Sequence, residues 1–426
     1  MAMKNSGIEW IGNIPSDWEV KKIKHLFQII HGSTPESNNI EYWDGNIPWI
    51  TPADMPDFGI ISKGERTITK RGYNSCGTTI LPKDSIIIST RAPIGKINIT
   101  QAELCTNQGC KSLISLKTHT KYYFYLLYAI QEELVKEGKG TTFIELGTFE
   151  LGNFNILFPS LSEQRAISAF LDTQCSKIDN IITELEQQIE ILKQYKTSLI
   201  TETVTKGLNK NVPMKNSGID WIGKIPDHWE VKRLKYIGNA KNGLTYSPED
   251  ISNEGILVLR SSNIQEGKLT FEDNVYVDMK IPKDIIVKEN DILICSRNGS
   301  RELIGKCALI DKKIEGNTYG AFMCVFRSSY NRFIHYIFQS NLFNYYLGNY
   351  LTSTINQLTN TNLHNMKIPI TFDEKEQSNI VTYLDSQTGK IDNLISEKQQ
   401  SIDTMKTYKK SLIYEYVTGK KRVNKK

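Results

Sequence analysis

The chain contains the same sequence frame twice, and this repeat constrains the fold more than any other feature. The segment Met3 to Leu26 returns as Met214 to Ile237, with 16 identities in 24 positions at an offset of 211. The segment Glu163 to Thr205 returns as Glu376 to Thr418, with 23 identities in 43 positions at an offset of 213. Between these segments the copies differ. A chain of 426 residues therefore divides into two halves, each long enough for its own core.

Composition is that of a globular protein, with 39% hydrophobic and 23% charged residues. The net charge of 52 − 47 = +5 permits nucleic-acid binding without requiring it. Seven cysteines without a CxxC pair indicate a reduced, cytoplasmic protein without a disulfide framework or zinc ribbon. The N-terminus lacks the apolar core of a signal peptide, and no apolar run approaches the ~20 residues of a membrane span. The basic C-terminal residues, Lys420, Lys421, Arg422, Lys425 and Lys426, predict a solvated, frayed tail.

Each half begins with a tryptophan motif, which is Trp10 to Trp18 in the first copy and Trp221 to Trp229 in the second. Its paired tryptophans predict an anchor on the core. A long insert follows, rich in β-branched and aromatic residues and broken by turn residues. The strands expected in the inserts are Ser85–Thr90, Leu113–Leu116, Asp291–Cys295 and Phe322–Phe326, and the expected helices are Tyr122–Glu137 and Arg332–Tyr350. This mixture without a βαβ rhythm predicts an α+β fold with two mixed, mostly antiparallel domains.

A long helix closes each half. Ser160 with Glu163, and Asp373 with Glu376, match capping boxes. Apolar residues then recur at seven-residue spacing, which requires a partner helix. The predicted pairing residues are Ile178, Leu185, Leu192, Leu199, Ile391, Leu394, Met405 and Leu412, with Tyr408 also in the seam of the second copy. Ile181 and Tyr195 support the first seam, and Lys398 and Ser401 interrupt the second. The two helices are expected to form an antiparallel coiled coil about a pseudo-two-fold axis, with Gly207 as a helix stop.

Catalytic motifs do not account for the sequence. The chain contains no phosphate-binding loop, dinucleotide fingerprint, HExxH or GxSxG motif, and its six histidines are scattered. The repeated acid-x-Lys spacing at Glu19 and Lys21 has no upstream acid that would complete a nuclease site. The Asn/Asp-Pro-Pro-aromatic run of a base methyltransferase is absent too. We therefore expect a noncatalytic chain without a bound metal or cofactor.

The inserts carry residues suited to DNA. Arginine and lysine can bind guanine edges or phosphates, and asparagine can bind adenine. Thr90-Arg91 with Gly95-Lys96 is echoed by Ser296-Arg297 with Gly305-Lys306, each after an apolar strand. The candidate DNA-binding residues are Thr34, Arg66, Arg71, Arg91, Lys96, Lys111, Arg260, Asn263, Arg297, Asn298, Arg301 and Lys306. For any single cation, a structural ion pair is the alternative interpretation.

Three segments resemble the specificity subunits of type I restriction–modification systems. They are the WIGxIPxxWEVKxxK motif of both halves, the GSTPESNNIEYWDGNIPWITPADM stretch from Gly32 to Met55, and LSEQRAISAFLD from Leu161 to Asp172 with its repeat at Lys375 to Asp385. The resemblance covers essentially the whole chain. The second copy departs from the GSTP pattern at Asn242 to Tyr246, which indicates a recognition domain of a different subclass.

The resemblance implies a division into target recognition domains at 1–158 and 214–371 and conserved helical regions at 159–210 and 372–426. It implies that each recognition domain binds half of a split, asymmetric double-stranded DNA target, and that the helices set the spacer. It also implies docking of two modification subunits, which bind S-adenosylmethionine, and association with restriction subunits that use ATP and Mg²⁺. Two alternatives stay open: a protein-binding scaffold with two heads on a coiled-coil spacer, and a self-sufficient nuclease or methyltransferase.

Overall fold

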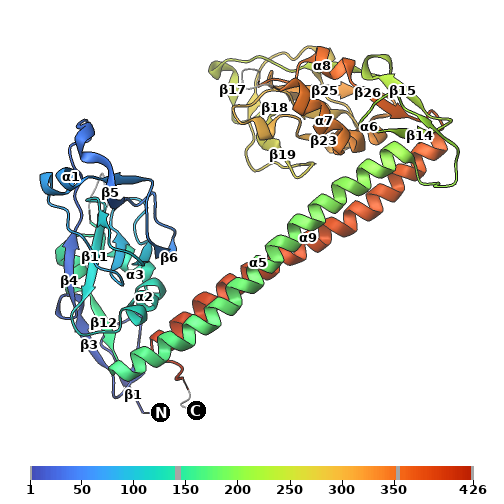
Figure 1. Ribbon diagram of the computed structural model, residues 1–426. Coiled ribbons are helices and arrows are strands. Elements are labelled where there is room, and N and C mark those ends of the chain that lie inside the picture. Colours follow the sequence, from blue (N-terminus) through green and yellow to red (C-terminus); the bar gives the residue numbers. More distant parts are fainter. Residues whose placement is uncertain (1, 140–144, 352–355, 424–426) are drawn as a thin grey trace. The chain divides into compact units, whose positions relative to one another are not determined.

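The computed structural model describes residues 2–139, 145–351 and 356–423, and its contacts divide the chain into two compact units. Unit 1 comprises Met1–Leu185 with Gln400–Lys426, and unit 2 comprises Glu186–Gln399. Each unit contains one globular head: we call the part of unit 1 that precedes α5 the first head, and the part of unit 2 that lies between α5 and α9 in the sequence the second head. The long helices α5 (Leu161–Lys206) and α9 (Glu374–Val417) each contribute a segment to both units (Figure 1).

The first head is built on a five-stranded sheet in the order β4-β11-β8-β9-β6. Only the β6–β9 pair of this sheet is parallel. The central strand β8 is completely buried, which explains its uninterrupted run of isoleucines. The strands are β1 (Met3–Asn5), β2 (Asn13–Pro15), β3 (Glu19–Lys22), β4 (Phe27–His31), β5 (Trp43–Ile50), β6 (Phe58–Ile61), β7 (Arg66–Ile68), β8 (Ile86–Ser89), β9 (Ile97–Thr100), β10 (Cys105–Thr106), β11 (Cys110–Ser115) and β12 (Asn155–Phe158).

The second head repeats this plan with a four-stranded antiparallel sheet in the order β16-β25-β22-β23. Its β18–β24 pair is parallel, as is the β5–β10 pair of the first head. The mostly antiparallel α+β prediction is thus confirmed. The strands are β13 (Met214–Asn216), β14 (Lys224–Pro226), β15 (Glu230–Arg233), β16 (Asn239–Asn242), β17 (Ile251–Ser252), β18 (Ile256–Leu259), β19 (Ile264–Gln265), β20 (Lys268–Leu269), β21 (Tyr276–Val277), β22 (Ile292–Cys295), β23 (Cys307–Leu309), β24 (Thr318–Tyr319), β25 (Met323–Arg327) and β26 (Lys367–Ile370).

Each long helix predicted in the inserts is divided into two shorter helices. The bounds are α1 (Lys70–Ser75), α2 (Thr120–Ala129), α3 (Gln131–Lys136), α4 (Thr148–Asn153), α6 (Asn331–Phe338), α7 (Asn341–Tyr350) and α8 (Asn360–Asn365). The chain changes direction between α6 and α7, where the Asn341 N–H donates to Thr201 Oγ1 of α5 (2.9 Å). This tertiary hydrogen bond supplies an acceptor for a helix-start donor, a partner that helical periodicity does not reveal.

The tryptophan motifs anchor the heads on the long helices. Trp18 and Trp229 are fully buried, and each indole N–H donates to the glutamate at the start of the adjoining helix. The distances from Nε1 are 3.4 Å to Glu163 Oε1 and 3.1 Å to Glu376 Oε1. Ser160 Oγ caps α5 by accepting from the Glu163 N–H (3.3 Å), so this glutamate joins the helix cap to the motif.

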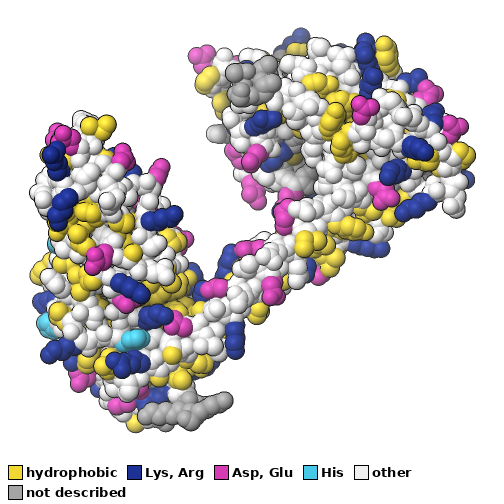
Figure 2. Space-filling model, viewed as in Figure 1, with side chains coloured by type: hydrophobic (Ala, Val, Ile, Leu, Met, Phe, Trp, Pro, Cys, Tyr) yellow, Lys and Arg dark blue, Asp and Glu magenta, His cyan; other side chains and the backbone are white. Residues whose placement is uncertain are grey.

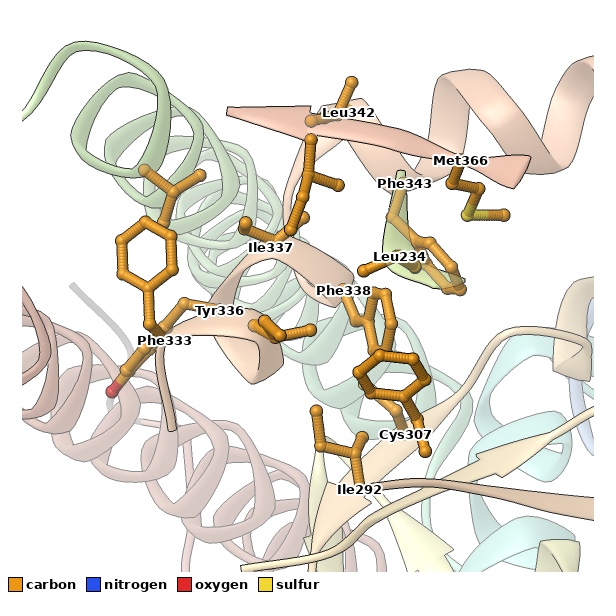
Figure 3. Close-up of a cluster of buried hydrophobic side chains, with 14 of the residues drawn as sticks. Leu234, Ile292, Cys307, Phe333, Tyr336, Ile337, Phe338, Leu342, Phe343 and Met366 are labelled. Atoms are coloured by element: carbon orange, nitrogen blue, oxygen red, sulfur yellow. The ribbon is translucent and has the colours of Figure 1, made fainter. Parts of the chain in front are cut away.

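Both helices contribute to the core of the second head. Figure 3 shows part of this cluster, with Phe333, Ile337 and Phe338 of α6 packed near Leu342 and Phe343 of α7. The same cluster includes buried residues from the C-terminal part of α5 and the N-terminal part of α9, which are Ile200, Val204, Ile380, Val381 and Leu384. The helix ends are therefore part of the head's hydrophobic core.

Within each unit, α5 and α9 pair through residues that alternate by three and four positions. On α5 these are Ile178, Ile182, Leu185, Ile189, Leu192, Lys196 and Leu199, and on α9 they are Leu384, Thr388, Ile391, Ile395, Lys398, Ile402, Met405, Lys409 and Leu412. All are buried or half-buried. The predicted residues Ile178, Leu185, Leu192, Leu199, Ile391, Met405 and Leu412 lie at these positions.

Four seam assignments are corrected. Leu394 is 45% exposed, and Ile395 takes its place. Ile181 and Tyr195, expected to support the seam, are 41% and 57% exposed, and Tyr408 is 54% exposed. In the second copy, two seam positions carry lysine. The apolar pattern alone therefore does not decide between two seams that differ by one residue. A one-residue shift rotates a side chain by about 100° around a helix.

Three lysines at seam positions bond to the opposite helix. Lys196 Nζ lies 2.6 Å from Asp392 Oδ1, Lys398 Nζ lies 2.6 Å from Gln188 Oε1, and Lys409 Nζ lies 2.7 Å from both oxygens of Asp179. Partner numbers fall along α9 as they rise along α5, so the pairing is antiparallel, as predicted. Polar contacts of this kind fix the register of a coiled coil.

Each long helix ends on a tryptophan motif. Gly207 (φ 71°) follows α5 and lies against Trp229, which confirms the predicted helix stop. Gly419 (φ 73°) follows α9 and lies against Pro15 and Trp18, where an added Cβ would come within 2.5 Å of Pro15 Cδ. The two ends are therefore equivalent.

The expectation of a frayed C-terminal tail is wrong for residues 420–422. Lys420 Nζ donates to the carbonyl oxygens of Ile11 and Asn13, at 2.7 Å each. Arg422 pairs with Asp17, and Lys421 pairs with Glu415 (2.7 Å). The tail is held by backbone carbonyls that the sequence pattern does not display. Lys425 and Lys426 lie outside the described residues.

Candidate nucleic-acid interface

The two heads carry the same backbone frame around two of the predicted arginines. Four long-range backbone hydrogen bonds of the first head have counterparts in the second. They are Thr90 N to Gly109 O with Ser296 N to Phe322 O, Leu146 N to Thr90 O with Leu358 N to Ser296 O, Ser33 N to Thr106 O with Leu244 N to Tyr319 O, and Asn107 N to Ile50 O with Gly320 N to Leu259 O. All eight donor–acceptor distances lie between 2.7 and 3.0 Å. This frame makes Arg91 and Arg297 structural equivalents.

Each of these arginines begins a loop that leaves the central strand of its sheet. The loop returns through a glycine in the left-handed region, Gly95 (φ 96°) or Gly305 (φ 90°). The glycine N–H donates back to the last strand residue, Ser89 or Cys295. The sequence echo between the two loops therefore reflects one turn geometry that is built twice.

The second head has a groove of about 1010 Å³ beside this frame. Its lining includes Tyr246, Arg260, Ser261, Arg297, Asn298 and Phe322. Three of the predicted DNA-binding residues, Arg260, Arg297 and Asn298, thus face one hollow. Cations, an amide and aromatic rings in one groove match the side chains that contact phosphates and base edges.

Arg297 is exposed, and its guanidinium lies over the Phe322 ring, 5.2 Å from the ring centre. Phe322 is itself 60% exposed. Among the described residues, no carboxylate lies within ion-pair distance of Arg297. The ring attracts the cation without accepting any of its hydrogen-bond donors.

Arg260 occupies the same groove in a different state. Its Nη2 atom lies 2.8 Å from Asp273 Oδ2, and the Arg260 Nε atom is buried without a hydrogen-bond partner among the described residues. Asp273 therefore holds the guanidinium while one of its donors stays unused. Such an arginine can bind a ligand only with its remaining N–H groups.

In the first head the equivalent arginine belongs to an ion-pair cluster. Arg91 Nε lies 2.9 Å from Glu145 Oε2, and the nearly buried Lys111 ammonium lies 3.2 Å from Glu145 Oε1. Burial acts to raise the pKa of Glu145, but hydrogen bonds from Arg91 and Lys111 outweigh it and lower the pKa. Arg91 keeps its two Nη groups for a ligand.

Three candidate residues have structural roles instead of free surfaces. Lys111 is 4% exposed and also donates to Leu146 O (2.7 Å). Lys96 Nζ donates to the Pro52 and Met55 carbonyl oxygens. Asn263 is fully buried, where its Oδ1 accepts from the Arg260 N–H (2.9 Å). The polar atoms of these three residues bond inside the head, so direct DNA contact by them stays an untested prediction that this bonding does not favour.

The other candidates lie on the surface outside the groove. Arg66 stacks on Trp43 at 3.4 Å, Arg71 pairs with Glu41 at 2.8 Å, and Thr34 donates to Gln108. Arg301 Nη2 donates to Leu351 O (2.8 Å), and Lys306 lines a different groove between the second head and the helix pair.

The aromatic part of the groove is not evident from the sequence. The apolar run Phe322–Phe326 predicts a strand, but β25 begins at Met323 and leaves the Phe322 ring outside the sheet. In the sequence, Tyr246 stands out only as part of the departure from the first copy's GSTP pattern. A phenylalanine directly after Gly320-Ala321 is the one local signal of an exposed turn.

The helix pair has two different flanks. Within unit 1, Asp172 of α5 accepts from Tyr125 Oη at 3.0 Å, and within unit 2, Asp385 of α9 accepts from Tyr336 Oη at 2.5 Å, so in each unit one flank of the helices contacts the head. By heptad spacing, the exposed residues Ile181, Tyr195, Leu394 and Tyr408 lie on the other side of the seam. Ile181 corresponds to Leu394 and Tyr195 to Tyr408 at the repeat offset of 213. We call these four residues the outer flank.

Other features of the described residues are plain. All seven cysteines are free. In the described ranges, no cluster of three or more His, Cys, Asp or Glu side chains could hold a metal ion. Over the same residues, no helix has both the length and the apolar character needed to cross a bilayer.

Comparison with known proteins identifies the class of this chain. The family model described as the type I restriction modification DNA specificity domain matches residues 15–191 and 226–404. The MjaIX specificity subunit of Methanocaldococcus jannaschii is 35% identical over 289 residues, which is 65% of this chain and 65% of that relative. The MjaVIII specificity subunit of the same organism is 26% identical over 96% of this chain and 94% of its own length. A solved chain from a type I R-M system has a TM-score of 0.71 at 15% identity, covering 95% of this chain and 98% of its own, and supports the fold.

The two family matches together cover more than half of the chain, which therefore belongs to the type I restriction–modification DNA specificity subunits. In this family the specificity subunit is the noncatalytic, DNA sequence-recognition component of the system. DNA is the partner of this family, and the relatives are named as subunits of type I restriction enzymes.

Proposed function

We propose that this subunit recognises a bipartite, asymmetric DNA target, with one half-site bound by each head. The observation that carries the proposal is the pair of equivalent backbone frames that present different side chains. Gly109, Pro35 and Thr51 of the first head correspond through the frame to Phe322, Tyr246 and Arg260 of the second. Equal scaffolds with unequal contact atoms are suited to two unlike base sequences.

DNA contacts in the second head fall to the groove that Arg260, Arg297 and Asn298 line. In the first head they fall to the equivalent surface around Arg91, with Thr34 and Gln108 beside it. The frame turns are short and held by several backbone hydrogen bonds, so the side chains start from defined positions. Preorganised donors of this kind favour base discrimination, and exposed cations add phosphate binding.

The helix pair sets the unread spacer in this proposal. α5 contains 46 residues, and an α-helix of that length spans about 69 Å. Seam lysines bonded across the pair support a fixed register, and the helix ends are built into the head cores. A stiff pair of this kind supports half-sites at a constant separation.

We further propose that the outer flank docks two modification subunits. Its apolar residues form two pairs, Ile181 with Tyr408 in unit 1 and Leu394 with Tyr195 in unit 2. Exposed aromatic and aliphatic residues are common anchors of protein interfaces (Figure 2 shows hydrophobic side chains on the helix surface). The repeat offset gives each pair an equivalent partner site. S-adenosylmethionine belongs to those modification subunits, while ATP and Mg²⁺ belong to the restriction subunits, and the assembly acts on DNA in the cytoplasm.

Selection from a randomised duplex pool tests target recognition. The full chain with its modification subunits should recover two different short elements at a constant separation. Affinity should fall steeply as salt rises, because phosphate contacts release counterions. Recovery of one contiguous element would contradict the bipartite target, and no enrichment at all would favour a protein-binding scaffold.

Partner docking has a separate test. The double variant Tyr195→Ser with Leu394→Ser should remove one bound modification subunit, and Ile181→Ser with Tyr408→Ser should remove the other. These side chains are exposed, so the folded chain should persist by circular dichroism. Native mass spectrometry reports the stoichiometry. Full occupancy in both double variants would exclude the outer flank as the docking surface.

A further inference from the structure

The equivalent arginines of the two heads stand in opposite electrostatic settings. Glu145 of the first head and Gln357 of the second occupy the same place in the frame, directly before Leu146 and Leu358. Gln357 forms a backbone bridge with Arg297, but its amide is neutral, whereas Glu145 is charged and bonds Arg91. The second head therefore leaves its arginine without the carboxylate that the first head supplies.

An aromatic ring takes the place of that carboxylate. Phe322 lies under the Arg297 guanidinium, and its frame equivalent in the first head is Gly109. A Cβ at Gly109 would lie 3.0 Å from Pro52 Cγ and 3.2 Å from Asn107 Oδ1, so the first head is crowded where the second carries a ring. Of the two described frames, that of the second head alone places an aromatic ring beside its arginine.

The aromatic ring attracts the cation without using its donors. A cation–π contact leaves the N–H groups of a guanidinium free for a ligand, whereas a carboxylate partner consumes some of them. Guanine presents two acceptors, N7 and O6, side by side in the major groove, and this spacing suits two N–H groups of arginine. The same fork also suits a phosphate, but a phosphate contact carries no base preference, so a change in base preference on substitution separates the two contacts.

We infer that Arg297, held on the Phe322 ring, selects a guanine in the half-site bound by the second head. The inference rests on the proposed function, because it assigns a base to a groove proposed to bind DNA. Arg297 makes the base contact, and Phe322 is a positioning residue that keeps the guanidinium edge directed into the groove.

The first experiment repeats the duplex selection with the complex that carries Arg297→Lys. Lysine keeps the charge but loses the planar fork, so the preference for guanine at one position of one half-site should weaken while the other half-site is unchanged. Phe322→Leu should weaken the same preference more mildly, since it removes the ring but retains an apolar side chain. Arg233→Ala, at an exposed arginine on β15 outside the groove, is the matched control and should retain the full target.

A second experiment probes the guanine atom directly. Replacing the selected guanine by 7-deazaguanine removes the N7 acceptor and leaves base pairing intact. The unmodified complex should lose roughly tenfold in affinity for this duplex, and the Arg297→Lys complex should lose clearly less, because its single ammonium makes a weaker contact with N7. An unchanged guanine preference in Arg297→Lys, or equal losses in both complexes, would overturn the inference.

Failure of the proposed function gives a different result. If the heads do not bind a split target, the unmodified complex recovers no pair of separated elements. If the target is split but Arg297 does not select guanine, the pair is recovered and the Arg297→Lys complex recovers the same bases at every position.

Discussion

The two heads share their buried frame and differ in the exposed side chains around it, which we call the rim. Trp18 and Trp229 are both fully buried and both bond a glutamate at a helix start. By contrast, the loop arginines meet a carboxylate in the first head and an aromatic ring in the second. We expect the buried frame to carry stability and the exposed positions to carry specificity. Substitutions in the frame should therefore have equal effects in both heads, while rim substitutions should have effects confined to one.

The largest expected effect is at the shared frame. Trp18→Ala and Trp229→Ala should each destabilise by about 3–5 kcal/mol, because each removes a fully buried indole and leaves a cavity. Denaturant unfolding followed by circular dichroism measures the loss. Trp221→Ala is a control, since this side chain is 42% exposed and its removal should cost about 1 kcal/mol or less. A small effect of either buried substitution would show that the two motifs are not equivalent anchors.

Disrupting the ion-pair cluster of the first head should produce a smaller difference in stability between the two heads. Glu145→Ala leaves the buried Lys111 ammonium without its carboxylate and should cost about 2–3 kcal/mol, reduced by the partial exposure of Glu145. Gln357→Ala at the equivalent position should change stability by less than about 0.5 kcal/mol. Thermal unfolding compares the two variants. Equal losses would mean that Lys111 does not depend on Glu145.

Removing either loop arginine should weaken DNA recognition at one half-site only. Arg91→Ala should weaken discrimination at one half-site and Arg297→Ala at the other, each by about 1–2 kcal/mol. Lys111 still neutralises Glu145 when Arg91 is absent, so the first head should stay folded. Competition binding with duplexes altered in one half-site gives the measurement. Loss at both half-sites from a single substitution would contradict one half-site for each head.

Acid should weaken the second head selectively. Burial, with a smaller contribution from Lys196, lowers the pKa of His335 from 6.5 to about 4. The equivalent residue of the first head is Phe124, because the next residues in the two chains, Tyr336 and Tyr125, make the same hydrogen bond to Asp385 and Asp172. The unfolded chain binds a proton near pH 6.5, so His335 makes unfolding more favourable as pH falls from 6.5 towards 4. Opening of α6, followed by hydrogen exchange, should increase roughly tenfold between pH 7 and 5.

The matched control for that measurement is His335→Phe. This variant should show the weaker pH response of α2 in the first head. An α6 segment whose acid response is the same with and without His335 would assign the effect to carboxylates instead.

The repeat predicted most of the fold, because identical segments fold alike and a heptad spacing requires a partner helix. It also predicted the equivalence of Arg91 and Arg297, since each follows an apolar strand and precedes Gly-Lys. Side-chain environments were harder to predict. Lys111 is buried through a partner 34 positions away, which no local pattern reveals. The sequence also did not show that Phe322 lies outside the sheet, because a strand end is defined by pairing.

Leu394 illustrates the same limit on the helices. Leucine at position 394 and isoleucine at 395 are equally apolar, and the contacts with α5 decide which side chain enters the seam. The seam lysines removed two apolar markers that would have fixed the register in sequence. Their bonds to Asp179, Asp392 and Gln188 cross between the helices and become visible only when both helices are placed.

The central claim is that a stiff helix pair separates two unlike DNA-recognising heads. Removing one heptad from each helix, residues 182–188 and 399–405, keeps the seam in register and shortens the pair by about 10 Å. The decisive measurement is target selection with the complex that carries both deletions. The account predicts the same two half-sites with a spacer shorter by about 3 base pairs. The original spacer in the deleted complex would contradict it.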